Sequence, residues 1–218
     1  HAPSGALSDK SELREILEVA KDCSFYVLCD EIYAEFDREL VPTIFSLDSE
    51  RGIVTTSFTK AYGLGGLKLG TALANESLVD ELYADVLNTV GNSPNVVQFI
   101  AAELLTNGIN SLEEHKCKWR RVKNLTEEWM NQKNVMYFPN KISVTYWAKL
   151  PIEDTHKWVV TEAIPSHSVA PVPGAYFLFN DGYELEKSNM MRLGLGAINP
   201  QGEHGLEDLE TLGKALLQ

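Results

Sequence analysis

The sequence predicts an α/β fold that is followed by a smaller α+β part. Two observations predict it. Short apolar and β-branched runs follow a helical pattern in the first half, and the pattern changes near residue 120. Strands buried on both faces read as almost continuous apolar runs, as these do. The 218 residues, 44% of them hydrophobic, suffice for one large domain or two small ones.

The first half begins with a helix. Residues 8–21 place Leu and Ile on one face; Ser8 or Asp9 can cap the helix, and Glu12 can complete a capping box. The strand-like runs that follow are 25–29, 53–58 and 68–74. Helical patterns then occupy 78–90 and 96–105, with Gly91 and Pro94 between them.

A long polar helix at 111–131 leads into the second half. The elements expected there are a strand at 142–150, a helix at 154–164, an extended segment at 168–172, a strand at 190–195 and a last helix at 203–217. We therefore expect one domain over residues 1–120 and a smaller one over 121–218.

Composition excludes several classes of function. The net charge of −12 argues against nucleic acid or an anionic membrane as a partner. No apolar run approaches the ~18 residues of a membrane span, and the first ten residues lack a signal peptide's basic start and apolar stretch. Cys23, Cys29 and Cys117 are too scattered for a disulfide framework or a zinc site, and the five histidines show no metal spacing. We expect a cytoplasmic protein without a metal.

Asp30-Glu31-Ile32-Tyr33 comes directly after the first expected strand. Ligands of open α/β sheets bind beyond the carboxyl ends of strands, so this position favours functional side chains. Taken alone, the segment is better explained as a loop acid and a packed tyrosine.

A segment rich in hydroxyls, lysines and glycines, residues 57–68, follows the second strand. Its side chains and backbone N–H groups can cradle a phosphate. It matches neither of the common nucleotide loops, because Lys68 stands where GxGxxG needs its last glycine and GxxxxGK[ST] also fails. Taken alone, Lys60 in this segment would be an ordinary surface lysine.

Together these segments resemble the class I/II aminotransferases in pattern and order. The matching runs are DEIY at 30–33, SFTKAYGLGGLKLG at 57–70 and RLGLG at 192–196. HAPSG at 1–5 is similar to the tail of the family's NPxNPTG, and VPGAYF at 172–177 to its VxPGxxF. The resemblance implies the second half of the three-layer α/β/α large domain that binds pyridoxal 5'-phosphate (PLP), followed by the α+β small domain.

The resemblance also implies roles for particular residues. Lys60 would bond to the cofactor aldehyde and later move the α-proton of the substrate. Asp30 would be a buried carboxylate that keeps the pyridine nitrogen protonated, and Tyr33 would hydrogen-bond the ring hydroxyl. Ser57 and Lys68 would contact the phosphate. Lys68 replaces the family's usual arginine, which keeps the charge but loses the bidentate fork.

Arg192 would grip the α-carboxylate of the substrate through a two-pronged salt bridge. Without the resemblance, an arginine in an apolar strand would more often pair with a structural acid. Ala2 falls where the family's NPTG asparagine touches the ring hydroxyl, and alanine cannot make that bond.

The match begins past the middle of the family's large domain. We therefore expect an open sheet edge, an apolar face, and a partner that is either a second copy or a complementing N-terminal polypeptide. Three functions remain open. The first is transfer of an amino group between an amino acid and a 2-oxo acid. The second is another PLP reaction on an amino acid, of the lyase or decarboxylase type. The third is a non-catalytic truncated subunit.

Overall fold

A computed structural model describes residues 1–178, 187–195 and 203–216 of the chain. It consists of two compact units, Leu7–Lys116 (the first unit) and His1–Ala6 with Cys117–Gln218 (the second unit). Residues 1–6 belong to the second unit, where the Ala2 carbonyl accepts hydrogen bonds from the Ser143 and Thr145 hydroxyls.

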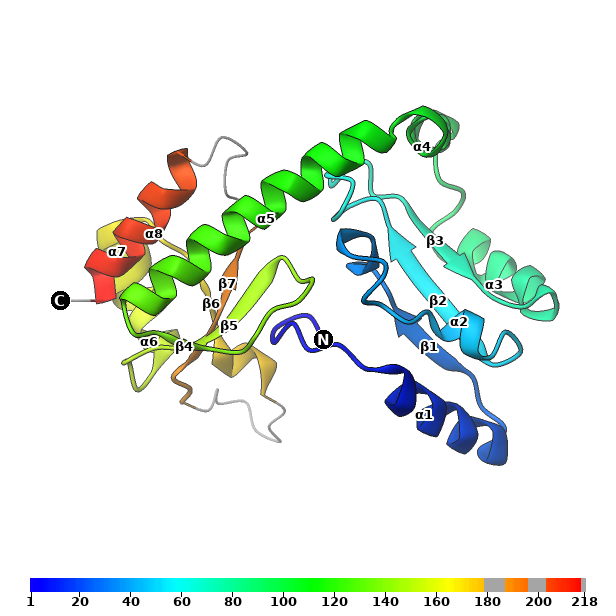
Figure 1. Cartoon of the computed structure of the whole chain (residues 1–218), viewed down its shortest axis with the longest axis horizontal. Coiled ribbons are helices and arrows are strands. Elements are labelled where there is room, and N and C mark those ends of the chain that lie inside the picture. Colours follow the sequence, from blue (N-terminus) through cyan, green and yellow to red (C-terminus); the bar gives the residue numbers. More distant parts are fainter. Residues whose placement is uncertain (179–186, 196–202, 217–218) are drawn as a thin grey trace. The chain divides into compact units, whose positions relative to one another are not determined.

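The first unit contains a three-stranded sheet in the order β1-β2-β3 (Figure 1). Strands β1 (Val27–Asp30) and β2 (Gly52–Ser57) are parallel, and β3 (Gly70–Leu73) is antiparallel to β2. In the described residues β1 and β3 are therefore edge strands.

One face of this sheet is covered by α1 (Lys10–Cys23) and α2 (Ile44–Leu47). Helix α1 begins at Asp9, and its predicted capping box with Glu12 is present. Leu13 and Leu17 of α1 form a core with Ile44 and with Val54 of β2. This core fixes the strands that precede the two candidate segments.

Two further helices, α3 (Glu76–Thr89) and α4 (Asn95–Asn107), carry many exposed apolar side chains. Helix α3 contributes no buried residue, and α4 contributes only Ala101. The exposed large apolar residues of the two helices are Val79, Tyr83, Val86, Leu87, Val96, Phe99, Ile100 and Leu105. Exposed apolar side chains gathered into a patch often mark an interaction surface.

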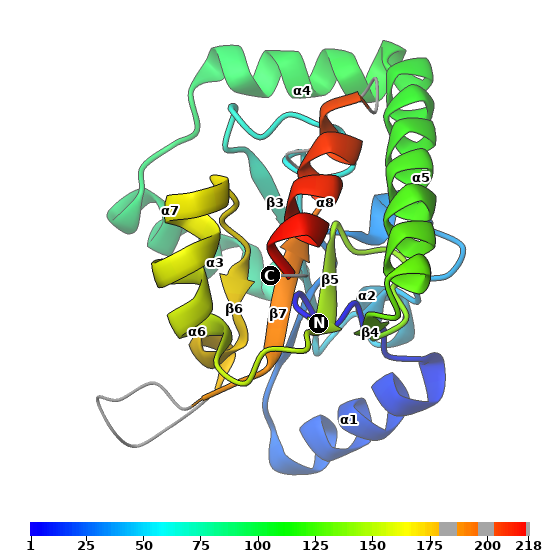
Figure 2. The same cartoon turned by 90° about the vertical axis from the view of Figure 1, so that its left-hand side faces the viewer.

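The second unit is built on a four-stranded antiparallel sheet in the order β4-β5-β7-β6. Its strands are β4 (Met136–Tyr137), β5 (Thr145–Lys149), β6 (Val172–Pro173) and β7 (Met190–Gly194). Helices cover one face (Figure 2): α5 (Ile109–Gln132), whose first turns belong to the first unit, α8 (Glu203–Leu216) and a bent helix over residues 155–167. Met130, Tyr146, Ala163 and Met191 are fully buried there.

The bent helix consists of α6 (Thr155–Trp158), a π-helix η2 (Val159–Ala163) and α7 (Ile164–His167). It extends past the predicted end at residue 164. Other elements that the sequence did not predict are α2, β4 and the 3₁₀ turns η1 (Ala34–Phe36) and η3 (Gly174–Phe177). All are too short for a periodic pattern to indicate them. Gly196 of the predicted RLGLG run lies outside the described residues. No helix in the described part of the chain is long and apolar enough to cross a membrane.

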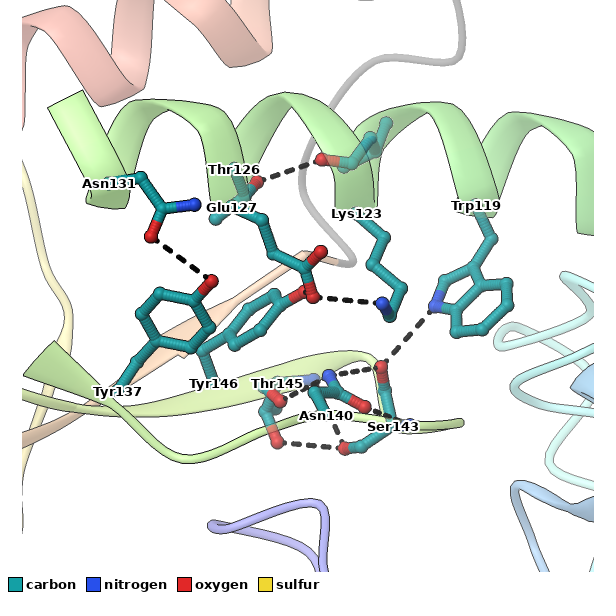
Figure 3. A network of polar contacts seen from close by, with 11 residues as sticks. Trp119, Lys123, Thr126, Glu127, Asn131, Tyr137, Asn140, Ser143, Thr145 and Tyr146 are labelled. Atoms are coloured by element: carbon teal, nitrogen blue, oxygen red, sulfur yellow. Dashed lines mark hydrogen bonds and ion pairs between the residues drawn. The ribbon is translucent and has the colours of Figure 1, made fainter.

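A polar network ties α5 to the strand hairpin beneath it (Figure 3). The Tyr146 hydroxyl donates to Glu127 Oε1 at 2.6 Å, and Lys123 Nζ lies 2.8 Å from the same oxygen. Burial, followed by the hydrogen bond to Glu127, raises the pKa of Tyr146 well above its usual value. The tyrosine therefore stays a neutral donor to a carboxylate, which is the stronger kind of hydrogen bond.

Replacing Tyr146 by phenylalanine keeps the ring and removes this donor. A hydrogen bond to a charged group contributes about 1.5–3 kcal/mol, so we expect Y146F to lower the free energy of unfolding by about 1.5 kcal/mol in urea denaturation. The matched control is Y137F, because the Tyr137 hydroxyl makes only an exposed 3.4 Å contact with Asn131. An equal loss in the two variants would show that the Glu127 bond contributes nothing special.

Candidate active site

The candidate site is at the carboxyl edge of the first unit's sheet. Strand β1 ends at Asp30 and its parallel neighbour β2 ends at Ser57, with Asp30 paired to Thr55. The Glu31 N–H continues the pairing by donating to the Thr55 carbonyl at 2.8 Å. The segments that carry Tyr33 and Lys60 therefore leave the sheet at the same edge, where ligands of such sheets bind.

Asp30 is exposed, which differs from the buried carboxylate that the resemblance implied. Its Oδ1 accepts a hydrogen bond from the Ile32 N–H at 3.2 Å. Leu28, two residues earlier and so on the same face of β1, is 64% exposed. Burial of Asp30 was expected because both faces of the sheet were expected to be covered. Within the first unit, α1 and α2 pack against the opposite face only, the one that carries Val27 and Cys29.

The Lys60 segment turns sharply after β2. Ser57 Oγ donates to Thr59 Oγ1 at 2.6 Å and accepts from the Thr59 N–H at 3.0 Å. The Gly63 N–H donates to the Lys60 carbonyl at 3.1 Å, and Gly63 has φ +69°. A Cβ at Gly63 would lie 3.0 Å from the His115 ring, so this turn requires glycine.

Two lysine amines of this segment have no partner in the described part of the chain. Lys60 is partly buried and Lys68 is exposed, and neither forms an ion pair or a side-chain hydrogen bond with a described residue. Lys68 has φ +51°, a left-handed conformation that is uncommon for a residue with a side chain. The edge thus presents two uncompensated cations beside the hydroxyls of Ser57 and Thr59.

The segments after β1 and β2 are linked by charge and through His115. Burial, followed by the charge of Glu35, raises the pKa of Tyr62, while Arg38 lowers it, so charges in the segment after β1 act on the segment after β2. The Phe36 ring stacks on His115 at 6.5 Å, and His115 lies against the Gly63 turn. Tyr33, which is partly buried, precedes the 3₁₀ turn that contains Phe36.

Arg192 lies in the second unit, on β7. It is paired with Trp147 on one side and Val172 on the other, and its guanidinium carbon is 5.2 Å from the centre of the Phe177 ring. Trp147 contacts Phe177 edge to face at 5.2 Å. No described residue forms an ion pair or hydrogen bond with the Arg192 side chain. The alternative of a structural acid is therefore not realised among the described residues, and the cation is held by an aromatic face.

Sequence reasoning missed the contribution of Glu31 and Arg38. Glu31 is only 3% exposed although it lies within the DEIY motif, and Arg38 pairs with it. The sequence did contain a signal for this pair, because an acid directly after a buried strand can pair with a basic residue seven positions later. The described residues contain no cluster of His, Cys, Asp or Glu suited to a metal ion, and the three cysteines are free thiols.

Known proteins are similar to this chain in sequence. The family model for aminotransferase class I and II matches residues 1–201. A putative aminotransferase of Bacillus subtilis, YugH, is 33% identical over 180 residues, which cover 80% of this chain and 46% of that protein. An LL-diaminopimelate aminotransferase of Dehalococcoides mccartyi (strain CBDB1) is 27% identical over 98% of this chain and 54% of its own length. The chain thus spans about half the length of the curated relatives it matches.

Solved structures agree in fold. A PLP-dependent aminotransferase from Streptococcus suis superposes with a TM-score of 0.84 at 24% identity, over 99% of this chain and 55% of that one. An aspartate aminotransferase from Thermotoga maritima gives a TM-score of 0.83 at 18% identity, over 100% of this chain and 55% of that one. They confirm the predicted fold class. By its match to the family model over residues 1–201, the chain belongs to the class I and II aminotransferase family.

Proposed function

We propose that this chain is the C-terminal part of a PLP-dependent aminotransferase that transfers an amino group between an amino acid and a 2-oxo acid. The observation that carries the proposal is the position of Lys60. It is partly buried, its amine has no partner among the described residues, and it lies beyond a strand parallel to the one that ends at Asp30. The relatives' names as aminotransferases support the same reaction.

The side chains at the edge fit the chemical groups of PLP. When bound, PLP supplies an electron sink for the bonds at the α-carbon of an amino acid. In this proposal the Lys60 amine holds the cofactor aldehyde and moves the α-proton of the substrate. Asp30 holds the proton on the pyridine nitrogen, and Tyr33 donates to the ring hydroxyl.

The phosphate position is proposed at Ser57, Thr59 and Lys68. The hydroxyls of Ser57 and Thr59 already exchange one hydrogen bond, and Ser57 Oγ also lies 3.2 Å from the Leu69 carbonyl. A phosphate would take these donors and pair with the free Lys68 amine. The phosphate carries ≈ −1.5 to −2 charges, so one lysine and two hydroxyls leave it under-compensated.

Arg192 is proposed to bind the α-carboxylate of the substrate. Its planar side chain can make two parallel charge-assisted hydrogen bonds. The Phe177 ring lies under the guanidinium without using any of its N–H donors, and Trp147 contacts Phe177 edge to face. The donors therefore remain available for a carboxylate.

The apolar surface of α3 and α4 and the edges of β1 and β3 indicate a partner. We propose a homodimer or a complementing N-terminal polypeptide that covers them, because open edges and large apolar patches favour association. In this proposal residues 1–120 are the C-terminal half of the PLP-binding domain and 121–218 the small domain. The protein acts in amino acid metabolism in the cytoplasm, without nucleic acid or membrane as a partner.

Two other functions stay distinguishable by experiment. Another PLP reaction, of the lyase or decarboxylase type, would give a PLP absorbance band but no new amino acid from an added 2-oxo acid. A non-catalytic subunit would give neither. The PLP absorbance band, together with product analysis after mixing an amino acid with a 2-oxo acid, therefore separates all three.

Borohydride reduction tests the anchor. Reduction of the PLP-treated chain should attach the cofactor to the peptide that contains Lys60, because that amine is free to react. Lys60→Ala should abolish the labelling. Lys68→Ala should retain the label at Lys60 but need more PLP, because it removes a phosphate partner. A label on another lysine, with Lys60 unmodified, would refute the assignment.

The variant Arg192→Lys tests the carboxylate position. It keeps the charge and loses one of two bonds of about 1.5–3 kcal/mol each, so the KM for the amino acid should rise about tenfold to a hundredfold. The Kd for PLP should stay unchanged. Arg121→Lys, an exposed position on α5, is the control. Equal loss of amino acid and PLP binding in Arg192→Lys would mean that the arginine is structural.

A further inference from the structure

Glu31 carries a buried carboxylate with two partners. It is 3% exposed; its Oε1 accepts a hydrogen bond from the Ile44 N–H at 3.1 Å, and its Oε2 lies 2.6 Å from Arg38 Nη1. Arg38 Nε also contacts Glu35 at 3.2 Å. Both carboxylate oxygens of Glu31 therefore bind groups in the segment that directly follows Glu31.

These contacts close the loop that contains Tyr33. This loop begins after Asp30, the last residue of β1, and ends at Ile44, the first residue of α2. Glu31 fixes the middle of this loop through Arg38 and its end through the backbone of Ile44. Because Asp30 and Glu31 are consecutive, Glu31 extends to the covered side of the sheet while Asp30 stays on the exposed side.

The same loop supports the Lys60 segment. Phe36, 1% exposed, stacks on His115, and His115 lies against the Gly63 turn. Movement of the loop would displace Phe36. The His115 ring, against which the Gly63 turn lies, would then lose its contact with Phe36. The Glu31–Arg38 ion pair is buried on the glutamate side only, because the Arg38 side chain is 44% exposed. A pair with a buried carboxylate adds little net stability compared with apolar residues of similar shape, but it can enforce one conformation.

We infer that Glu31 is a positioning residue of the proposed site. Its carboxylate holds residues 33–44, and with them the Tyr33 ring, at the carboxyl edge of the sheet without touching cofactor or substrate. The inference rests on the proposed function for the role of Tyr33, but the contacts that carry it are internal to the protein.

The test compares E31A and E31Q with L17A, which removes a buried side chain from the core that α1 shares with Ile44 but removes no hydrogen-bond or ion-pair partner of the Glu31 carboxylate. In hydrogen–deuterium exchange without PLP, E31A should speed exchange of residues 33–44 about tenfold or more, because it leaves the buried Ile44 N–H unpaired. E31Q should restore most of the protection, since its amide oxygen can accept that N–H. L17A should affect residues 10–23 more than the loop.

The second arm uses PLP and its absorbance band. In E31A the pH midpoint of the band should shift in the direction that Y33F shifts it, and E31Q should return it towards the wild-type value. Unchanged exchange at 33–44 in E31A, or a loop effect no larger than in L17A, would overturn the inference. A pH midpoint of the absorbance band that shifts in Y33F but not in E31A would also overturn the inference. Failure of PLP to label Lys60 in the wild-type chain would instead refute the proposed function, and the exchange arm would still decide on Glu31.

Discussion

The parallel pairing of β1 with β2 is the interaction on which the candidate site depends. Parallel strands end at the same edge, so the register that pairs Asp30 with Thr55 brings the segments after both strands together. The core of Leu13, Leu17, Ile44 and Val54 holds this pairing from one side. A one-residue shift of the register would move every side chain of a strand to the other face and separate the candidate groups.

Most of the longer elements could be predicted from the sequence because their patterns are strong. The Asp9–Glu12 capping box and the β-branched run of β2 are local signals, and both occur where predicted. The exposure of Asp30 and the burial of Glu31 could not be predicted, since they depend on which sheet face the helices cover. The lack of a described acid beside Arg192 likewise depends on contacts between distant segments.

The proposed site residues come from both units, and different interactions hold them in each. In the first unit, backbone turns and a buried carboxylate fix the loops, while the Lys60 and Lys68 amines have no partner among the described residues. In the second, an aromatic pair, Phe177 and Trp147, supports Arg192 without consuming its donors. In both units, these cations therefore lack a charge partner in the part of the chain that the structure describes, as is expected where an anionic ligand supplies the missing charge.

A PLP titration, followed by absorbance and then dialysis, tests the central claim that the β1–β2 edge is the cofactor site. We predict a PLP absorbance band that depends on Lys60 and is lost when the chain alone is dialysed. The binding should be weak because Ser57, Thr59 and Lys68 compensate the phosphate charge poorly and Ala2 supplies no side-chain hydrogen bond. A partner that covers α3 and α4 should make the binding tight. A band that is unchanged in Lys60→Ala would contradict the account, as would the absence of a band at any PLP concentration.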